Sequence, residues 1–272
     1  MIPNVLSIAG SDPSGGAGIQ ADLKAISANG AFAMAALTAL TAQNTQGVSG
    51  IHLVPPDFVK KQIDSIFDDI RVDVVKIGMI ANAEIAQAIA RALAGRDAPI
   101  ILDPVMIAKG GAALLQPDAI AVLRDTLLPL AFILTPNLPE AAHLLAAQVA
   151  TTRDEMEAQG RALCQLGPAA VLMKGGHLSG PDSPDCLVTS ERVMWFEAPR
   201  MPTRNTHGTG CTLSSALAAQ LAKTADIQSA VAAAKSYVAS AIAHADQLSV
   251  GSGHGPTHHF ANLYASRKET TS

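Results

Sequence analysis

Short apolar runs alternate with helix-like segments along nearly the whole chain, and this alternation limits the possible folds most strongly. The helix-like segments carry apolar residues every three or four positions, whereas the apolar runs are continuous. Strands of that kind are buried on both faces, which favours a mostly parallel sheet covered by helices on either side. We predict such strands within residues 5–10, 72–78, 99–105, 131–137 and 169–177.

The segments between these runs complete an α/β pattern. Helices are predicted near residues 19–28, 59–70, 85–93, 117–128, 152–166, 210–222 and 226–245, and a β-hairpin near 185–199. No internal repeat or Pro/Ser-rich linker divides the chain, so we predict one domain over residues 1–272, with 266–272 as a frayed tail.

Composition excludes several classes of protein. A formal charge of −4 without a basic run argues against nucleic acid or an anionic membrane as the main partner. Residues 30–51 are uncharged, but their second half is too polar to span a membrane. Three well-separated cysteines without a C-x-x-C motif support neither a disulfide framework nor a zinc site. With no basic segment before the first apolar run, we expect a cytoplasmic protein.

Polar residues and glycines follow five of the predicted strands. They are Gly10-Ser11-Asp12, Lys76-Ile77-Gly78-Met79, Asp103-Pro104, Thr135-Pro136-Asn137 and Lys174-Gly175-Gly176. In parallel sheets, ligands bind beyond the carboxyl ends of the strands. We therefore expect these five segments to line one site.

Two glycine-rich segments precede predicted helices, and each has a plain alternative. Residues 9–24 are either a tight turn or a backbone wall against a small ligand that Asp12 or Asp22 reaches. Residues 205–219 place two glycines before a helix, where backbone N–H groups suit a phosphate. Cys211 in that loop is either a small filler or a thiol with a lowered pKa.

Each of four further motifs has two possible interpretations when it is considered alone. Asn137 and Glu140 suit either a helix cap or a hydrated Mg²⁺ beside phosphates. Lys174 is either an ordinary surface lysine or a cation that binds a phosphate. Gln43 either belongs to a polar loop or binds the ring nitrogen and amine of an aminopyrimidine. Residues 253–259 hold three histidines, which favour a packed loop over a metal site. Together with the glycine loop, the motifs favour phosphoryl transfer.

The chain resembles the bacterial hydroxymethylpyrimidine/phosphomethylpyrimidine kinases of thiamine biosynthesis, in the ribokinase-like superfamily. The matching stretches, from residue 9 to 260, are AGSDPSGGAGIQADLK, TALTAQNTQGV, VKIGM, DPVM, TPNLPEA, KGGH, HGTGCTLSSALAA and GHGPTHHF. The resemblance implies a three-layer α/β/α sandwich, usually a homodimer. It also implies MgATP-dependent phosphorylation of 4-amino-5-hydroxymethyl-2-methylpyrimidine and then of its monophosphate.

The resemblance also assigns roles to residues. Gln43 would hold the ring nitrogen and amine of the pyrimidine. Lys174 would meet the ATP phosphates, and residues 206–210 would form the anion hole, with Gly208 and Gly210 stabilising transferred charge and Thr206 and Thr209 beside the nucleotide. The remaining expected contacts are Gly10, Ala17, Asp22 and Met79 around the ring, and Asn137, Glu140 and Asp103 near Mg²⁺.

Cys211 stands where the wider superfamily has an aspartate, the proposed general base, but it agrees with the thiamine branch. We expect Cys211→Ala to harm the first phosphorylation more than the second, because a phosphate monoester is already largely ionised near pH 7. Two other functions stay open. One is a pyridoxal or pyridoxine kinase, and the other is a pyrimidine sensor without catalysis.

Overall fold

The computed structural model describes residues 1–106, 114 and 117–264. Within these residues, eight strands form one sheet in the order β10-β9-β8-β7-β6-β5-β1-β2. From β2 to β8 every neighbouring pair is parallel, whereas β9 and β10 are antiparallel. The strands are β1 (Asn4–Ala9), β2 (Phe32–Leu37), β5 (Val74–Ile77), β6 (Ile100–Leu102), β7 (Ile133–Leu134), β8 (Ala170–Lys174), β9 (Asp185–Thr189) and β10 (Val193–Phe196). The predicted, mostly parallel sheet is confirmed.

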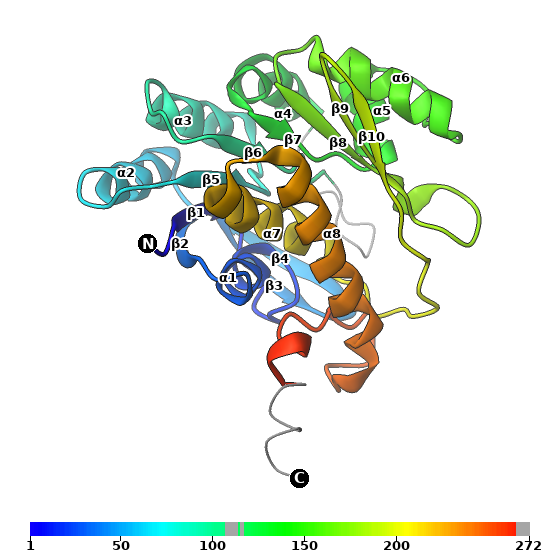
Figure 1. The fold of residues 1–272 in the computed structure, drawn as a ribbon. Coiled ribbons are helices and arrows are strands. Elements are labelled where there is room, and N and C mark those ends of the chain that lie inside the picture. Colours follow the sequence, from blue (N-terminus) through cyan, green and yellow to red (C-terminus); the bar gives the residue numbers. More distant parts are fainter. Residues whose placement is uncertain (107–113, 115–116, 265–272) are drawn as a thin grey trace.

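Helices cover both faces of this sheet (Figure 1). One layer contains α1 (Gly18–Ala28), α7 (Thr209–Thr224) and α8 (Ile227–Ala243). The other contains α2 (Pro56–Phe67), α3 (Ala83–Leu93), α4 (Pro117–Val122), α5 (Leu138–Leu145) and α6 (Arg153–Cys164). The architecture is therefore the expected three-layer α/β/α sandwich.

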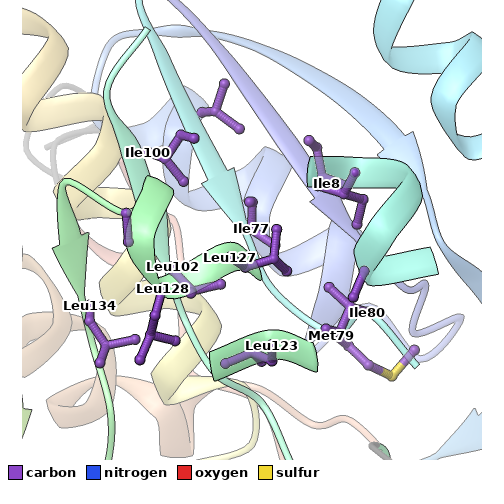
Figure 2. Close-up of a cluster of buried hydrophobic side chains, with 14 of the residues drawn as sticks. Ile8, Ile77, Met79, Ile80, Ile100, Leu102, Leu123, Leu127, Leu128 and Leu134 are labelled. Carbon is purple, nitrogen blue, oxygen red and sulfur yellow. The ribbon is translucent and has the colours of Figure 1, made fainter. Parts of the chain in front are cut away.

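Each strand of the sheet contributes side chains to two separate hydrophobic cores, because successive side chains point to opposite faces of the sheet. Figure 2 shows part of the core beneath α2 to α6, where Ile8, Ile77 and Leu102 come from three neighbouring strands. On the opposite face, Val5 and Ile101 pack under α1, α7 and α8. Burial of both faces explains why the strands are continuously apolar in the sequence.

Four of the segments predicted to line one site begin at or just after the ends of β1, β6, β7 and β8, whereas the fifth begins within β5. These strands are parallel neighbours, so their carboxyl ends meet at one edge of the sheet. That part of the sequence-based expectation is confirmed. The predicted hairpin near 185–199 is also present, as β9 and β10.

Three strands were not predicted from the sequence. No strand was assigned to β2, and a polar loop was weighed for residues 41–48, which cover the end of β3 (Ala39–Asn44), the turn after it and the start of β4 (Gly47–Leu53). These last two form a separate antiparallel hairpin. The helix expected near 117–128 is α-helical only as far as Val122, the end of α4. The chain then forms a π turn and a 3₁₀ turn, which ends at Leu130.

The predicted frayed tail, 266–272, lies outside the described residues. Among the residues that the structure describes, no helix combines the length and apolar character needed to span a membrane.

Candidate active site

A buried polar cluster lies beneath the site, between the sheet and the helices α1 and α7. Ser7 and Lys76 are register partners on β1 and β5, and both side chains face this helical layer. The Lys76 ammonium lies 2.9 and 2.8 Å from the two carboxylate oxygens of Asp22. Ser7 and Ser215 donate to the same carboxylate at 2.6 and 2.8 Å. The cluster ties two strands to both helices.

Burial decides how this cluster is charged. Both Lys76 and Asp22 have no exposed surface. Burial alone would lower the pKa of Lys76, but the negative charge of the adjacent Asp22, together with Cys211 and Asp103, raises that pKa above its ordinary value. The lysine therefore stays charged. The contact of Asp22 with a substrate ring stays a prediction, because its carboxylate is engaged by three protein side chains.

A second charged cluster lies at the carboxyl ends of β6 and β8. The Lys174 ammonium is 2.8 Å from Asp103 Oδ1 and 3.9 Å from Glu140 Oε2. Ser214 of α7 donates to Asp103 Oδ2 at 3.3 Å. A Cβ added to Gly210 would lie 3.3 Å from Lys174 Nζ, so the glycine loop borders the cluster. Four of the predicted segments, those of Asp103, Glu140, Lys174 and Gly210, therefore meet here.

The pKa values follow from this crowding. Burial would lower the pKa of Lys174, but the carboxylates of Asp103 and Glu140 raise it well above the ordinary value, so the ammonium stays charged. Burial raises the pKa of Glu140 to about 7, with Lys174 opposing the rise and Asp103 adding to it. The cluster thus holds one fixed cation between two carboxyl groups.

Asn137 and Glu140 form a capping box at the start of α5. The Asn137 side chain accepts the Glu140 N–H at 2.8 Å, and Glu140 Oε2 accepts the Asn137 N–H at 2.8 Å. The capping alternative is therefore present. These two bonds leave a further lone pair on each accepting oxygen, so the predicted metal role stays open.

The loop before α7 is held against the loop before α1. Gly208 is the N-cap of α7, with φ +76°, and a Cβ added there would lie 1.8 Å from the carbonyl oxygen of Gly16. Thr209 Oγ1 donates to the Thr206 carbonyl at 2.8 Å. Gly210 follows in the first turn of α7, whose leading N–H groups are not consumed by the helix. The predicted anion hole therefore has the required backbone form.

We expect Gly208→Ala to lower the free energy of unfolding by more than the 1–2 kcal/mol that a positive φ alone costs. The added Cβ would overlap the Gly16 carbonyl oxygen. Gly95→Ala is the matched control, since Gly95 has φ +73° and no described atom within 4 Å of its added Cβ. Urea unfolding compares the two variants. Equal losses would mean that the two loops separate at no cost.

Cys211 lies one residue beyond Gly210, in the first turn of α7, and is half-buried. Burial raises the pKa of its thiol to about 11; Lys76 opposes the rise, whereas Asp22 and Asp103 add to it. The backbone N–H of Gly18 is directed at the thiol. Burial therefore favours the neutral thiol, which is opposite to the alternative of a lowered pKa.

The segments predicted to surround a ring also meet. A Cβ added to Gly10 would lie 2.0 Å from the Met79 methyl carbon, so these two residues are in contact. The Met79 carbonyl accepts from Thr38 at 2.7 Å. Ala17, the N-cap of α1, donates its N–H to Asp12 Oδ2 at 2.8 Å. Asp12 is thus engaged by its own loop.

Gln43 lies on β3, after a β-bulge between Ala42 and Gln43. Its amide nitrogen is 3.4 Å from His207 Nε2, and its amide oxygen accepts from Thr41 at 3.2 Å. The hairpin therefore carries Gln43 to the loop before α7. His207 was expected only as part of the 206–210 anion hole, and Ser7 and Ser215 were given no role; a serine inside an apolar strand was the available signal for Ser7.

The three histidines of residues 253–259 bind no common partner. His258 and His259 are buried, and His259 Nε2 is 3.0 Å from Thr212 Oγ1. Burial lowers the pKa of His259 to about 4. No group of three or more His, Cys, Asp or Glu side chains suited to a metal occurs among the described residues. The packed-loop alternative describes this segment.

Comparison with known proteins gives concordant matches. The family described as phosphomethylpyrimidine kinase matches residues 12–258. A hydroxymethylpyrimidine/phosphomethylpyrimidine kinase of Escherichia coli strain K12 is 54% identical over 258 residues, covering 94% of this chain and 97% of that protein. A thiamine biosynthesis bifunctional protein of Geobacter sulfurreducens is 50% identical over 257 residues, covering 94% of this chain and 52% of that protein.

A solved structure gives the same fold. The ADP complex of Bacillus subtilis pyridoxal kinase superimposes with a TM-score of 0.89 at 35% identity, covering 97% of this chain and 99% of that one.

Proposed function

Because this chain belongs to the phosphomethylpyrimidine kinase family, we propose that it transfers a phosphoryl group from ATP to 4-amino-5-hydroxymethyl-2-methylpyrimidine and then to the resulting monophosphate. It is a kinase of thiamine biosynthesis. The observation that carries the proposal is the Asp103–Lys174–Glu140 cluster beside Gly210. A fixed cation next to helix N–H groups suits the charge that develops during phosphoryl transfer.

Lys174 acts on the phosphates of ATP. Its ammonium stays charged over the working pH range and is held by Asp103 at 2.8 Å, which limits its motion. Gly208 and Gly210, with the N-terminal turn of α7 behind them, direct N–H groups at the transferred phosphoryl group. Thr206 and Thr209 lie beside the nucleotide in the same loop.

Mg²⁺ fits the donor set next to this lysine. Asp103, Glu140 and Asn137 supply oxygens of the kind that Mg²⁺ prefers, and Mg²⁺ keeps several waters, so few protein ligands suffice. The raised pKa of Glu140 reports two carboxyl groups in a buried space, where a divalent cation favours ionisation of both. When bound, the ion neutralises phosphate charge.

The acceptor ring lies on the other side of Gly210. Gly10, Ala17 and Met79 form its walls, and Gln43 offers one acceptor and one donor to the amino group and ring nitrogen. In the first step the hydroxymethyl oxygen attacks the terminal phosphorus of ATP, the bond to ADP breaks, and the hydroxyl proton leaves. In the second step the attacking phosphate is already largely ionised.

Cys211→Ala is expected to lower kcat of the first phosphorylation by at most about tenfold and to leave the second unchanged. The thiol pKa of about 11 leaves too little thiolate at neutral pH for a larger contribution as base. Single-turnover rates of the two steps measure this. Equal losses in both steps would show that Cys211 acts through packing instead.

Pyridoxal kinase is the alternative, and it is favoured by the likeness to the Bacillus subtilis enzyme. A pyridine nitrogen would use only one side of the Gln43 amide, whereas an aminopyrimidine uses both. The function is tested by ADP release with MgATP and three acceptors: the hydroxymethylpyrimidine, its monophosphate and pyridoxal. We expect turnover with both pyrimidines and little with pyridoxal. Preferred turnover of pyridoxal would overturn the assignment, and pyrimidine binding without turnover would favour a sensor.

Three broader properties belong to the same proposal. We assign the kinase to the cytoplasm, which supplies its ATP, and treat residues 1–272 as one domain. We also assign it a homodimeric state. Two exposed apolar side chains, Ile51 and Leu53, share one face of the β3–β4 hairpin and support a self-association surface there. Sedimentation velocity reports the state directly.

A further inference from the structure

Asp12 is the centre of a dense hydrogen-bond network in the loop before α1. Its Oδ1 accepts the Ser14 N–H at 2.9 Å and the Ser14 hydroxyl at 2.6 Å. Its Oδ2 accepts the Ala17 N–H at 2.8 Å and lies 2.8 Å from His207 Nε2. The side chain is almost completely buried. Burial alone would raise its pKa, but the bonds from His207 and Ser14 hold that pKa below the ordinary value.

This network fixes the proton on one nitrogen of His207. An ionised carboxylate can only accept hydrogen bonds, so His207 Nε2 must carry a hydrogen and donate it to Asp12. The conclusion holds whether or not Nδ1 is also protonated. Asp12 therefore makes His207 Nε2 a permanent donor, in the way that a second partner fixes a histidine tautomer at other sites.

The amide of Gln43 faces this donor. With its nitrogen 3.4 Å from His207 Nε2, two donors are opposed. In addition, the single hydroxyl hydrogen of Thr41 is directed at two acceptors, Gln43 Oε1 at 3.2 Å and the Ser11 carbonyl at 2.9 Å. A half-turn of the amide removes the opposition between donors. Its oxygen then shares the Nε2–H of His207 with Asp12, which holds the shorter contact, its nitrogen donates to Thr41, and Thr41 donates to Ser11 alone.

We propose that Asp12 and His207 are a positioning pair that fixes the Gln43 amide with its oxygen toward His207, and thereby selects a 4-aminopyrimidine over its 4-oxo counterpart. The inference rests on the proposed binding of the pyrimidine by Gln43. A free glutamine amide can turn over and serve either ring. Discrimination between the two rings therefore requires something that holds the amide in one orientation.

The two rings present opposite hydrogen-bond patterns at the same edge. A 4-amino ring donates from its amine and accepts at the ring nitrogen, whereas a 4-oxo ring accepts at its oxygen and donates from that nitrogen. An amide held in one orientation pairs with the first pattern and opposes the second at both atoms. A site that leaves its polar groups unpaired rejects the wrong ligand strongly, so we expect at least about 100-fold weaker binding of the 4-oxo ring.

The test measures dissociation constants by calorimetry, without ATP, for 4-amino- and 4-oxo-5-hydroxymethyl-2-methylpyrimidine. Asp12→Asn offers His207 either an oxygen or an NH₂ group, so His207 Nε2 is no longer fixed as a donor and the Gln43 amide is no longer held in one orientation. His207→Leu removes the donor itself. Ser14→Ala is the matched control, because it deletes a hydrogen bond to Asp12 Oδ1 and leaves the contact with His207. Turnover of the 4-amino ring with MgATP is measured in parallel.

We expect Asp12→Asn and His207→Leu each to reduce the preference about tenfold or more, and the double variant to reduce it no further, since the two residues act as one unit. Ser14→Ala should retain the preference. An unchanged preference in His207→Leu would overturn the inference even if Asp12→Asn failed to fold, as would absence of a preference in the unaltered protein. Tight and selective binding without turnover would instead contradict the proposed function and leave the positioning pair standing.

Discussion

Replacing Lys76 by methionine is expected to lower the free energy of unfolding by about 3–5 kcal/mol. The variant keeps most of the side-chain volume but removes the cation that lies 2.8 Å from the Asp22 carboxylate. Neither side chain has any exposed surface, so water cannot replace the lost partner. The two serine donors satisfy hydrogen bonds but not the charge. Urea unfolding followed by circular dichroism gives the change.

Two further variants test whether the loss of stability arises from the buried Asp22 carboxylate that is left without its cation. Lys60→Met breaks an exposed ion pair with Asp64 and should cost no more than about 1 kcal/mol. Adding Asp22→Asn to Lys76→Met should restore much of the lost stability, because the amide carries no charge to bury. A loss for Lys76→Met as small as that for Lys60→Met would contradict this explanation.

Lys174→Met is expected to lower kcat by about 10²–10³-fold, the range found when one preorganised charge-stabilising group is removed. The Lys174 ammonium borders Gly210 and is held by Asp103, so no other cation described in this cluster can replace it. Its raised pKa keeps the Lys174 ammonium charged between pH 6 and 9, so titration of the lysine itself does not change the loss in that range. Steady-state ADP release with saturating acceptor measures kcat.

Two companion variants distinguish the effect of the charge at position 174 from the effect of where that charge lies. Lys174→Arg keeps the charge but changes its reach, so it should recover only part of the activity. Lys60→Met lies on the surface of α2 and should retain full activity. A loss below tenfold for Lys174→Met would remove this lysine from the phosphoryl-transfer machinery and leave it as a structural partner of Asp103.

The sheet edge could be predicted because its strands are apolar on both faces and polar residues stand out at their ends. Asp103 and Lys174 were predicted to line the same site on that basis, and they form an ion pair in the structure. Lys76 does not follow this rule. It was grouped with residues beyond a strand, yet it lies inside β5 and faces Ser7 beneath α1 and α7. An apolar run does not reveal which face each residue takes, so the buried partner of Lys76 could not be found.

The hairpin that carries Gln43 escaped prediction for a different reason. Strands β3 and β4 mix small, polar and apolar residues, and most of their side chains are partly or fully exposed, so neither forms a continuous apolar run. Asn137 and Glu140 were ambiguous because capping and metal binding use the same atoms. The contact of His207 with Asp12 joins residues 195 positions apart, which no local pattern indicates.

The most direct test of the central claim is the stoichiometry of ATP use with 4-amino-5-hydroxymethyl-2-methylpyrimidine as the sole acceptor. Mass spectrometry follows the acceptor while ADP is counted. The account predicts a monophosphate that appears first and is then consumed, a diphosphate as the final product, and two ADP for each acceptor molecule. An end point at the monophosphate with one ADP, or no phosphorylated pyrimidine at all, would contradict it.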